Sequence, residues 1–301
     1  MNPDGALAKG EIRFDSKLDG QCNGWILMTR FPGVPLSTLS LSTDKLKTID
    51  EQLANIVFRW REGLPVWKVT GNLECGISDE KPSSLDSLEI FGLRIIPSST
   101  MPAFGVKFDE PIINGLQYYR VKLEARLRKL QELEIFKGNR HLIHSIREFI
   151  AVRLPQLGIC NLQSQFVFTR YDLSPHNVFI SVDATEISGV FDFEFSGFFP
   201  ELDEFVNDAV DNEGDWPDIL YEAYLNRLEA CGMRTPRRGI EERLWREATA
   251  RSRLGGNIAP WWLEDLVPSE RMELEEDVLK SEKIVLEAMQ LLDQSVRDSI
   301  R

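Results

Sequence analysis

A compact β-rich unit lies in the middle of a chain that is otherwise patterned for helices. The unit has three short apolar strands with a turn near Asp183, predicted over residues 166–169, 177–180 and 187–191. Apolar residues recur at helical spacing on both sides of it, over residues 43–62, 113–136 and 141–157 and from 200 to the end. A further strand, Gly24–Phe31, comes before the first helix and is stopped by Pro32 and Gly33. This order predicts an α+β chain in which a β-hairpin is embedded among helices.

The composition indicates a folded and acidic protein. Its 301 residues are 43% apolar and 10% aromatic, which is enough for a sizeable core and argues against a disordered chain. Asp and Glu number 48 against 35 Lys and Arg, and a net charge of −13 repels phosphate backbones and anionic lipids. No stretch approaches the roughly 18 apolar residues of a membrane span. We therefore expect neither a nucleic-acid partner nor a membrane partner.

The four cysteines lie far apart and form no C-x-x-C pair. Such spacing is typical of neither a zinc site nor a disulfide scaffold. The N-terminal residues lack the apolar stretch of a signal peptide. These features predict a protein of the reducing cytoplasm.

Three polar residues follow the ends of the central strands. Asp172 lies on the loop after the first strand, Asn177 where the chain enters the second, and Asp192 after the third. The hairpin can bring these side chains together. A lone carboxylate suits a base beside a hydroxyl group, and a carboxylate with an amide suits Mg²⁺, which also takes substrate phosphates and water. The alternative interpretation is local, because Asp and Asn also favour turns and strand ends for their own hydrogen bonds.

These residues resemble a known family. The motif D-L-S-P-x-N from Asp172 and the stretch G-V-F-D-F-E-F-S-G-F-F-P-E from Gly189 are similar to the catalytic and metal loops of the aminoglycoside phosphotransferase and choline kinase group. The closest resemblance is to fungal aminoglycoside-phosphotransferase-like proteins. It implies a protein-kinase-like fold with a mostly helical C-terminal lobe. It also implies that Asp172 is the catalytic residue and that Asn177 and Asp192 bind Mg²⁺.

The stretch from Trp25 to Gly33 resembles the hinge strand of the same family. By this resemblance, the backbone of Thr29 and Phe31 receives the adenine of ATP. Residues 1–40 would form a reduced N-terminal β element with the hinge, and residues 41–301 the C-terminal lobe, ending in a long helix. Only 23 residues precede Gly24, and no glycine-rich phosphate motif occurs. We therefore expect the N-terminal nucleotide lobe to be largely missing.

The catalytic loop departs from the family at Arg170 and Tyr171, where the family usually has His-Gly. Arg170 can support the loop with its guanidinium donors, and Tyr171 adds bulk that narrows or reshapes the pocket. Drift at a tolerant loop position is the alternative. His176 is either a proton carrier or a solvated side chain. Glu194 or Asp203 is expected to act as a supporting or substrate-facing carboxylate.

The leading hypothesis is an enzyme that transfers phosphate from ATP, with Mg²⁺, to a hydroxyl group of a small molecule. The acidic chain favours a cationic acceptor. Two alternatives follow from the missing lobe. The scaffold could catalyse a non-phosphoryl step, for example cyclisation, on an apolar small metabolite, or it could be a pseudokinase that binds a partner without chemistry.

Overall fold

A computed structural model describes most of the chain from Pro32 onward. The described residues are 32–64, 66–72, 88–90, 93–95, 100–101, 106–107, 111–162, 166–193, 195–206, 218–264 and 271–300. The predicted strand Gly24–Phe31 lies outside them, with both hinge residues, Thr29 and Phe31. The division of the chain near residue 40 therefore stays a prediction.

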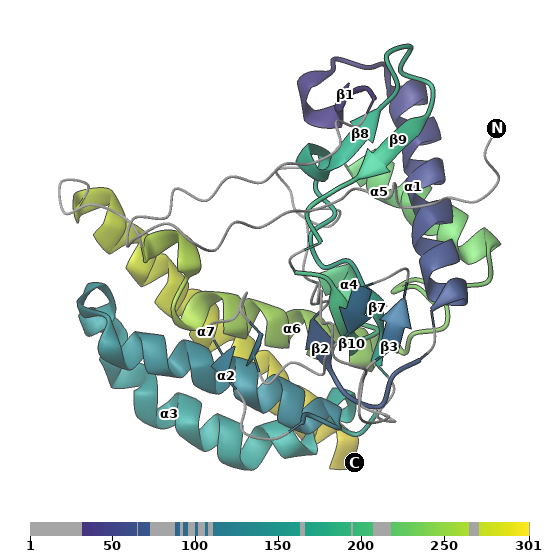
Figure 1. Ribbon diagram of the computed structural model, residues 1–301. Helices are drawn as coiled ribbons and strands as arrows, with labels where there is room; N and C mark the ends of the chain where they lie inside the picture. Colours follow the sequence, from purple (N-terminus) through teal and green to yellow (C-terminus); the bar gives the residue numbers. More distant parts are fainter. Residues whose placement is uncertain are drawn as a thin grey trace, which may run out of the picture.

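Short antiparallel strands and longer helices make up the described part of the chain (Figure 1). The strands are β1 Val34–Pro35, β2 Gly71–Asn72, β3 Leu88–Ile90, β4 Leu93–Ile95, β5 Thr100–Met101, β6 Val106–Lys107, β7 Phe166–Thr169, β8 Val178–Ile180, β9 Ile187–Val190 and β10 Gly197–Pro200. The α-helices are α1 Thr43–Gly63, α2 Gly115–Glu132, α3 Ile143–Glu148, α4 Asp203–Val206, α5 Asp218–Ala230, α6 Glu242–Ile258 and α7 Arg271–Ile300. This architecture confirms the predicted α+β class.

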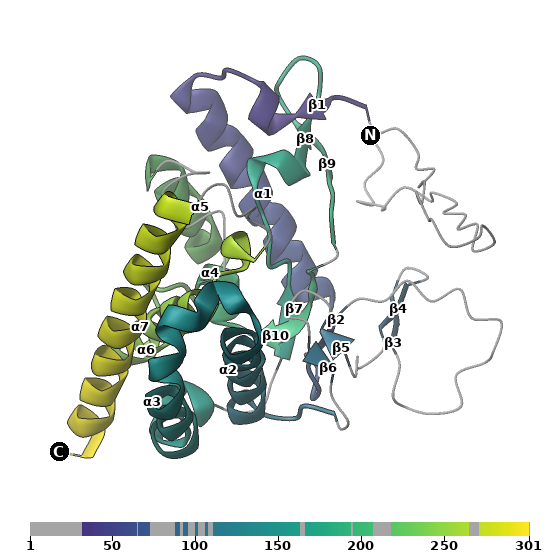
Figure 2. The same cartoon turned by 90° about the vertical axis from the view of Figure 1, so that its left-hand side faces the viewer.

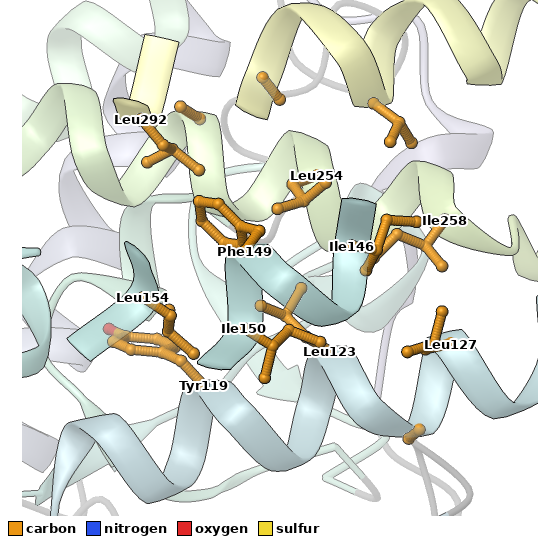
Figure 3. Packing of buried hydrophobic residues seen from close by; sticks show 14 of the residues in the cluster. Tyr119, Leu123, Leu127, Ile146, Phe149, Ile150, Leu154, Leu254, Ile258 and Leu292 are labelled. Carbon is orange, nitrogen blue, oxygen red and sulfur yellow. The ribbon is translucent and has the colours of Figure 1, made fainter. Parts of the chain in front are cut away.

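The larger hydrophobic core, called the helical core below, lies among α2, α3, α6 and α7. Figure 3 shows Leu123 of α2 and Ile150, just after α3, packed with Leu254 of α6 and Leu292 of α7. These side chains are at most 5% exposed, and each contributes about 1.5–3 kcal/mol by leaving water. Figure 2 shows the four helices gathered on one side of the molecule.

A second core, called the hairpin core, lies where α1 and α5 cover the strands β1, β8 and β9. Leu53 of α1 and Leu225 and Leu228 of α5 are at most 1% exposed, as are Val178 and Ile180 of β8. The apolar residues of α1 recur at helical spacing, so one face of the helix meets this core.

The predicted hairpin is confirmed for β8 and β9, which pair antiparallel with Val178 opposite Val190. The other edge of β8 pairs with β1, where Pro35 lies opposite Phe179. The predicted first strand, β7, is confirmed as a strand but belongs to a second sheet, in the order β2-β10-β7. The sequence pattern does not predict β1 or β10, because each is a few residues long and contains proline.

The predicted helices are found with changes at their ends. The 113–136 segment is α2 followed by a 3₁₀ segment, Glu134–Leu142. Asn114 caps α2 by accepting a 2.9 Å hydrogen bond from the backbone of Gln117. The 141–157 segment is α3 and then a π-helical turn, Phe149–Arg153, which leads into a 3₁₀ turn that contains Pro155. Among the described residues, no helix combines the length and the apolar character that crossing a membrane requires.

Candidate active site

The loop between β7 and β8 carries Asp172 and is fixed to both cores. The side chain of Tyr171 packs against the helical core, and Leu173, at 2% exposure, is buried in the hairpin core. Pro175 then begins a 3₁₀ turn, in which the backbone N–H of Asn177 donates to the carbonyl of Ser174 at 2.9 Å. Asp172 therefore lies between a half-buried tyrosine and a buried leucine on a short, well-anchored loop.

Asp172 and Asn177 are in direct contact. The amide Nδ2 of Asn177 donates to Oδ2 of Asp172 at 2.9 Å and to its backbone carbonyl at 3.3 Å. Asp172 itself is half-buried. Because the amide nitrogen faces Asp172, the amide oxygen of Asn177, which is the atom that binds cations, faces away from it.

Asp192 lies at the same end of the β8–β9 hairpin. The backbone N–H of Phe191 donates to the carbonyl of Asn177 at 2.8 Å. Asp192 is the next residue after Phe191, so this hydrogen bond places it near Asn177. Its φ of 57° lies in the left-handed region, which is unusual for a residue other than glycine. Its side chain is exposed and has no hydrogen bond or ion pair within the described residues.

Arg170 connects the Asp172 loop to the segment that carries Asp192. Its side chain is 1% exposed. Its guanidinium donates to the carbonyl of Phe191 and lies 4.7 Å from the centroid of the Phe193 ring. The hydroxyl of Ser196 donates to the Arg170 carbonyl at 2.9 Å. These contacts fit the predicted supporting role of this residue.

Tyr171 has a φ of 74°, a left-handed conformation that glycine adopts without strain. A tyrosine in this conformation is held there by its surroundings. The ring packs edge-on against Phe199 at 5.5 Å, and the hydroxyl contacts Nζ of Lys122 on α2. The side chain thus extends toward α2 and β10 and packs on the helical core.

Asp203, at the start of α4, does not face a substrate. It is 0% exposed. Its Oδ2 accepts hydrogen bonds from Tyr118 at 2.7 Å and from Lys122 at 3.3 Å, and its Oδ1 accepts one from Arg251 at 2.9 Å. Of the two roles predicted for Asp203, the structure fits the supporting one, because the carboxylate is buried and bonded to α2 and α6. Burial alone would raise its pKa, but Arg251 and Lys122 outweigh burial and hold the pKa below its ordinary value.

Sequence reasoning does not find Lys122. Burial lowers the pKa of its ammonium group from 10.5 to about 7, although Asp203 opposes this shift. In the sequence it is one of several basic residues in a helical segment. Its partners Tyr171 and Asp203 are 49 and 81 residues away, so no local pattern indicates it.

The remaining predicted residues divide into two groups. The side chain of His176 is exposed and has no hydrogen bond within the described part of the chain. It therefore matches the solvated alternative. Glu194, like Thr29 and Phe31, lies outside the described residues.

The oxygen donors of the site suit a hard cation. The amide oxygen of Asn177 and the carboxylate of Asp192 are both of the type that Mg²⁺ prefers. The described residues contain no cluster of three or more His, Cys, Asp or Glu side chains that could hold a metal by themselves. A cation at this place would complete its coordination with water or substrate oxygens.

Comparison with known proteins identifies the family. The model of the phosphotransferase enzyme family (APH) matches residues 12–241, which is more than half of the chain. The chain belongs to this phosphotransferase family. The matched range contains Asp172, Asn177 and Asp192. The predicted protein-kinase-like fold agrees with this membership.

One solved structure similar to this phosphotransferase-family chain is that of the gentamicin–APH(2″)-IIa complex. The two chains share 13% sequence identity, with a TM-score of 0.43, over 90% of this chain and 74% of the other. A search of curated proteins found no match.

Proposed function

We propose that this protein transfers the terminal phosphate of ATP to a hydroxyl group of a small molecule. The observation that carries the proposal is the Asp172–Asn177 contact at the end of the hairpin, in a chain that belongs to a phosphotransferase family. Phosphoryl transfer depends mainly on positioning and on neutralising phosphate charge. The loop described above supplies a fixed carboxylate and the amide of Asn177, and Asp192 adds a second oxygen donor at the same end of the hairpin.

Asp172 would act as the base that accepts or orients the acceptor hydroxyl. Its carboxylate is held by the amide of Asn177 at Oδ2, which leaves Oδ1 to receive the hydroxyl hydrogen bond. Half-burial keeps the group reachable and shields it partly from water. Leu173 and Tyr171, fixed in different cores, limit how far the carboxylate can move.

Asn177 and Asp192 would hold Mg²⁺ through oxygen atoms. The hydrogen bonds of the Asn177 side chain to Asp172 use its nitrogen and leave its oxygen for a cation, and Asp192 is exposed, which supports this role. When bound, Mg²⁺ neutralises charge on the phosphates of ATP. The buried guanidinium of Arg170 would keep the Asp192 segment in register with the Asp172 loop through the carbonyl of Phe191.

The acceptor we propose is a cationic alcohol, such as an amine-bearing one. Two carboxylates, Asp172 and Asp192, stand at the site, and the whole chain carries a net charge of −13. This field raises the local concentration of cations and disfavours anionic acceptors.

The experiment measures transfer of the γ-phosphate of ATP to a panel of amine-bearing and neutral alcohols. Formation of ADP with water as acceptor is the readout that needs no known substrate. Asp172→Asn should keep the fold and lower the rate by about 10²–10⁴-fold, because Asn is nearly isosteric but cannot take a proton.

Asp183→Asn is the matched control, since Asp183 lies on the exposed turn of the same hairpin, hydrogen-bonded to Ser181. It should leave the rate unchanged. Turnover of a substrate that continues undiminished after ATP is removed and metal is chelated would contradict the proposal and favour the non-phosphoryl alternative. Equal rates for wild type and Asp172→Asn would also contradict it.

A further inference from the structure

The backbone at Tyr171 is held in a conformation that its residue type disfavours. Its φ of 74° lies in the left-handed region, where a Cβ is crowded by the following peptide. A non-glycine residue stays there when its surroundings fix it. Tyr171 directly precedes Asp172, so any relaxation of this φ would move the carboxylate of Asp172.

The contacts of the Tyr171 side chain lead to α2. Its hydroxyl forms a hydrogen bond with Nζ of Lys122, and the same Nζ lies 4.9 Å from the centroid of the Tyr171 ring. Phe199 of β10 covers the ring at 5.5 Å. Lys122 therefore contacts the side chain at its hydroxyl end.

Lys122 is itself anchored. Its Nζ donates to Asp203 at 3.3 Å and to the hydroxyl of Tyr118 at 3.1 Å. Asp203 is fixed from α6 by Arg251, at 2.9 Å. Lys122, whose side chain is 11% exposed, thus links Tyr171 to the buried carboxylate of Asp203.

We infer that Lys122 is a positioning residue that holds the Tyr171–Asp172 backbone in its active geometry. The expected effect on kcat rests on the proposed function. The effect of Lys122 on the backbone at Tyr171 does not depend on it. Lys122 acts through Tyr171. Its hydrogen bond stabilises at Tyr171 a left-handed backbone that glycine would adopt without such support.

The test compares Lys122→Met, Tyr171→Phe and the double variant. Each single change removes the same hydrogen bond, so their effects should not add. We expect each single variant to lower kcat by about 10- to 100-fold, since a misplacement of about 1 Å can cost a factor of 10². The KM for ATP should change by less than about twofold. The double variant should be no slower than the slower single variant within about twofold.

Lys129→Met is the matched control. Lys129 lies on α2 two turns further on and pairs with Glu264, away from the Asp172 loop. It should leave kcat unchanged. Tyr171→Phe keeps the ring and its contact with Phe199, so it remains informative if Lys122→Met folds poorly.

A second readout needs no activity. Hydrogen–deuterium exchange of the peptide over residues 170–178 should be faster in Lys122→Met and Tyr171→Phe than in wild type and Lys129→Met. If wild type transfers no phosphate, the proposed function fails, and this exchange alone decides the inference. Unchanged exchange in both variants would overturn it. So would additive losses of kcat, or an unchanged kcat in an active enzyme.

Discussion

Asp50 is a carboxylate buried in the hairpin core. It lies on α1 at 1% exposure, and its Oδ2 has no hydrogen-bond partner among the described residues. Burial raises its pKa from 3.8 to about 8. The native protein therefore holds a proton on this group that the unfolded chain releases near pH 4.

The sign of the pH effect follows from this difference. Between about pH 4 and pH 8 the native state binds more protons than the unfolded state, so the free energy of unfolding falls as pH rises. Asp50→Asn should remove this dependence and raise stability at pH 8 by roughly 3–6 kcal/mol. Urea unfolding at pH 5 and pH 8 measures the free energy of unfolding of both proteins.

Glu51→Gln, an exposed neighbour on the same helix, is the control and should keep the pH dependence of wild type. If the free energy of unfolding changes equally with pH in wild type and Asp50→Asn, the prediction is wrong.

Residues of the site differ in how far the sequence predicts them. Asp172 and Asn177 are five positions apart, and their contact depends on one local turn, so the motif indicates it directly. The conformation of Tyr171 depends on Lys122 and Phe199, which are distant in sequence. A pattern read along the chain contains no information on these contacts, and for the same reason it cannot decide between the supporting and the substrate-facing role of Asp203.

At the scale of elements, the sheet β1-β8-β9 depends on the close approach of the backbone at Gly33 to the backbone at Ile180. Gly33 precedes β1 with a φ of 110°, and a Cβ there would lie 2.1 Å from the carbonyl oxygen of Ile180 and 2.9 Å from Oγ of Ser188. Ser188 of β9 in turn donates to the carbonyl of Pro32 at 2.5 Å. Only glycine fits both this φ and this space.

Gly33→Ala should therefore destabilise the protein by roughly 2–5 kcal/mol, through the strained φ and the clash together. Gly63→Ala is the control, because a Cβ at the end of α1 meets nothing within 4 Å. It should be neutral or stabilising by up to about 1 kcal/mol. Denaturant unfolding of both variants measures the difference. A Gly33→Ala protein as stable as wild type would mean that β1 is not packed on β8 as described.

Elements with long apolar runs were predictable, and short strands were not. The periodicity over residues 43–62 predicts α1 to within one residue, and the predicted long C-terminal helix is found as α7. The sequence predicts β7 as a strand but does not indicate its sheet, because its pairing partner β10 lies about 30 residues further along the chain. Phe168 pairs with Phe198, and nothing between residues 166 and 191 signals this partner.

On the scale of the whole molecule, the candidate site joins two separate hydrophobic cores. Tyr171 packs against the helical core and Leu173 is buried in the hairpin core, with Asp172 between them. The order of elements in the sequence predicts one lobe with an embedded hairpin. It does not predict that the hairpin has its own core with α1 and α5, since the helices involved are about 160 residues apart.

A ligand bound at this junction should stabilise the whole fold, because it binds only the native state. We expect MgATP to bind weakly, since no glycine-rich phosphate motif is present in the sequence. At a free concentration five times Kd, the gain is about 1 kcal/mol, or roughly 2–4 °C in Tm for a chain of this size. Asp192→Ala should abolish the shift, because Asn177 alone cannot hold Mg²⁺ with the phosphates. Asp183→Ala, on the opposite end of the hairpin, should keep it. Scanning calorimetry with MgATP, with ATP and chelator, and with Mg²⁺ alone separates the contributions, and a shift of equal size in Asp192→Ala would exclude the metal role of Asp192.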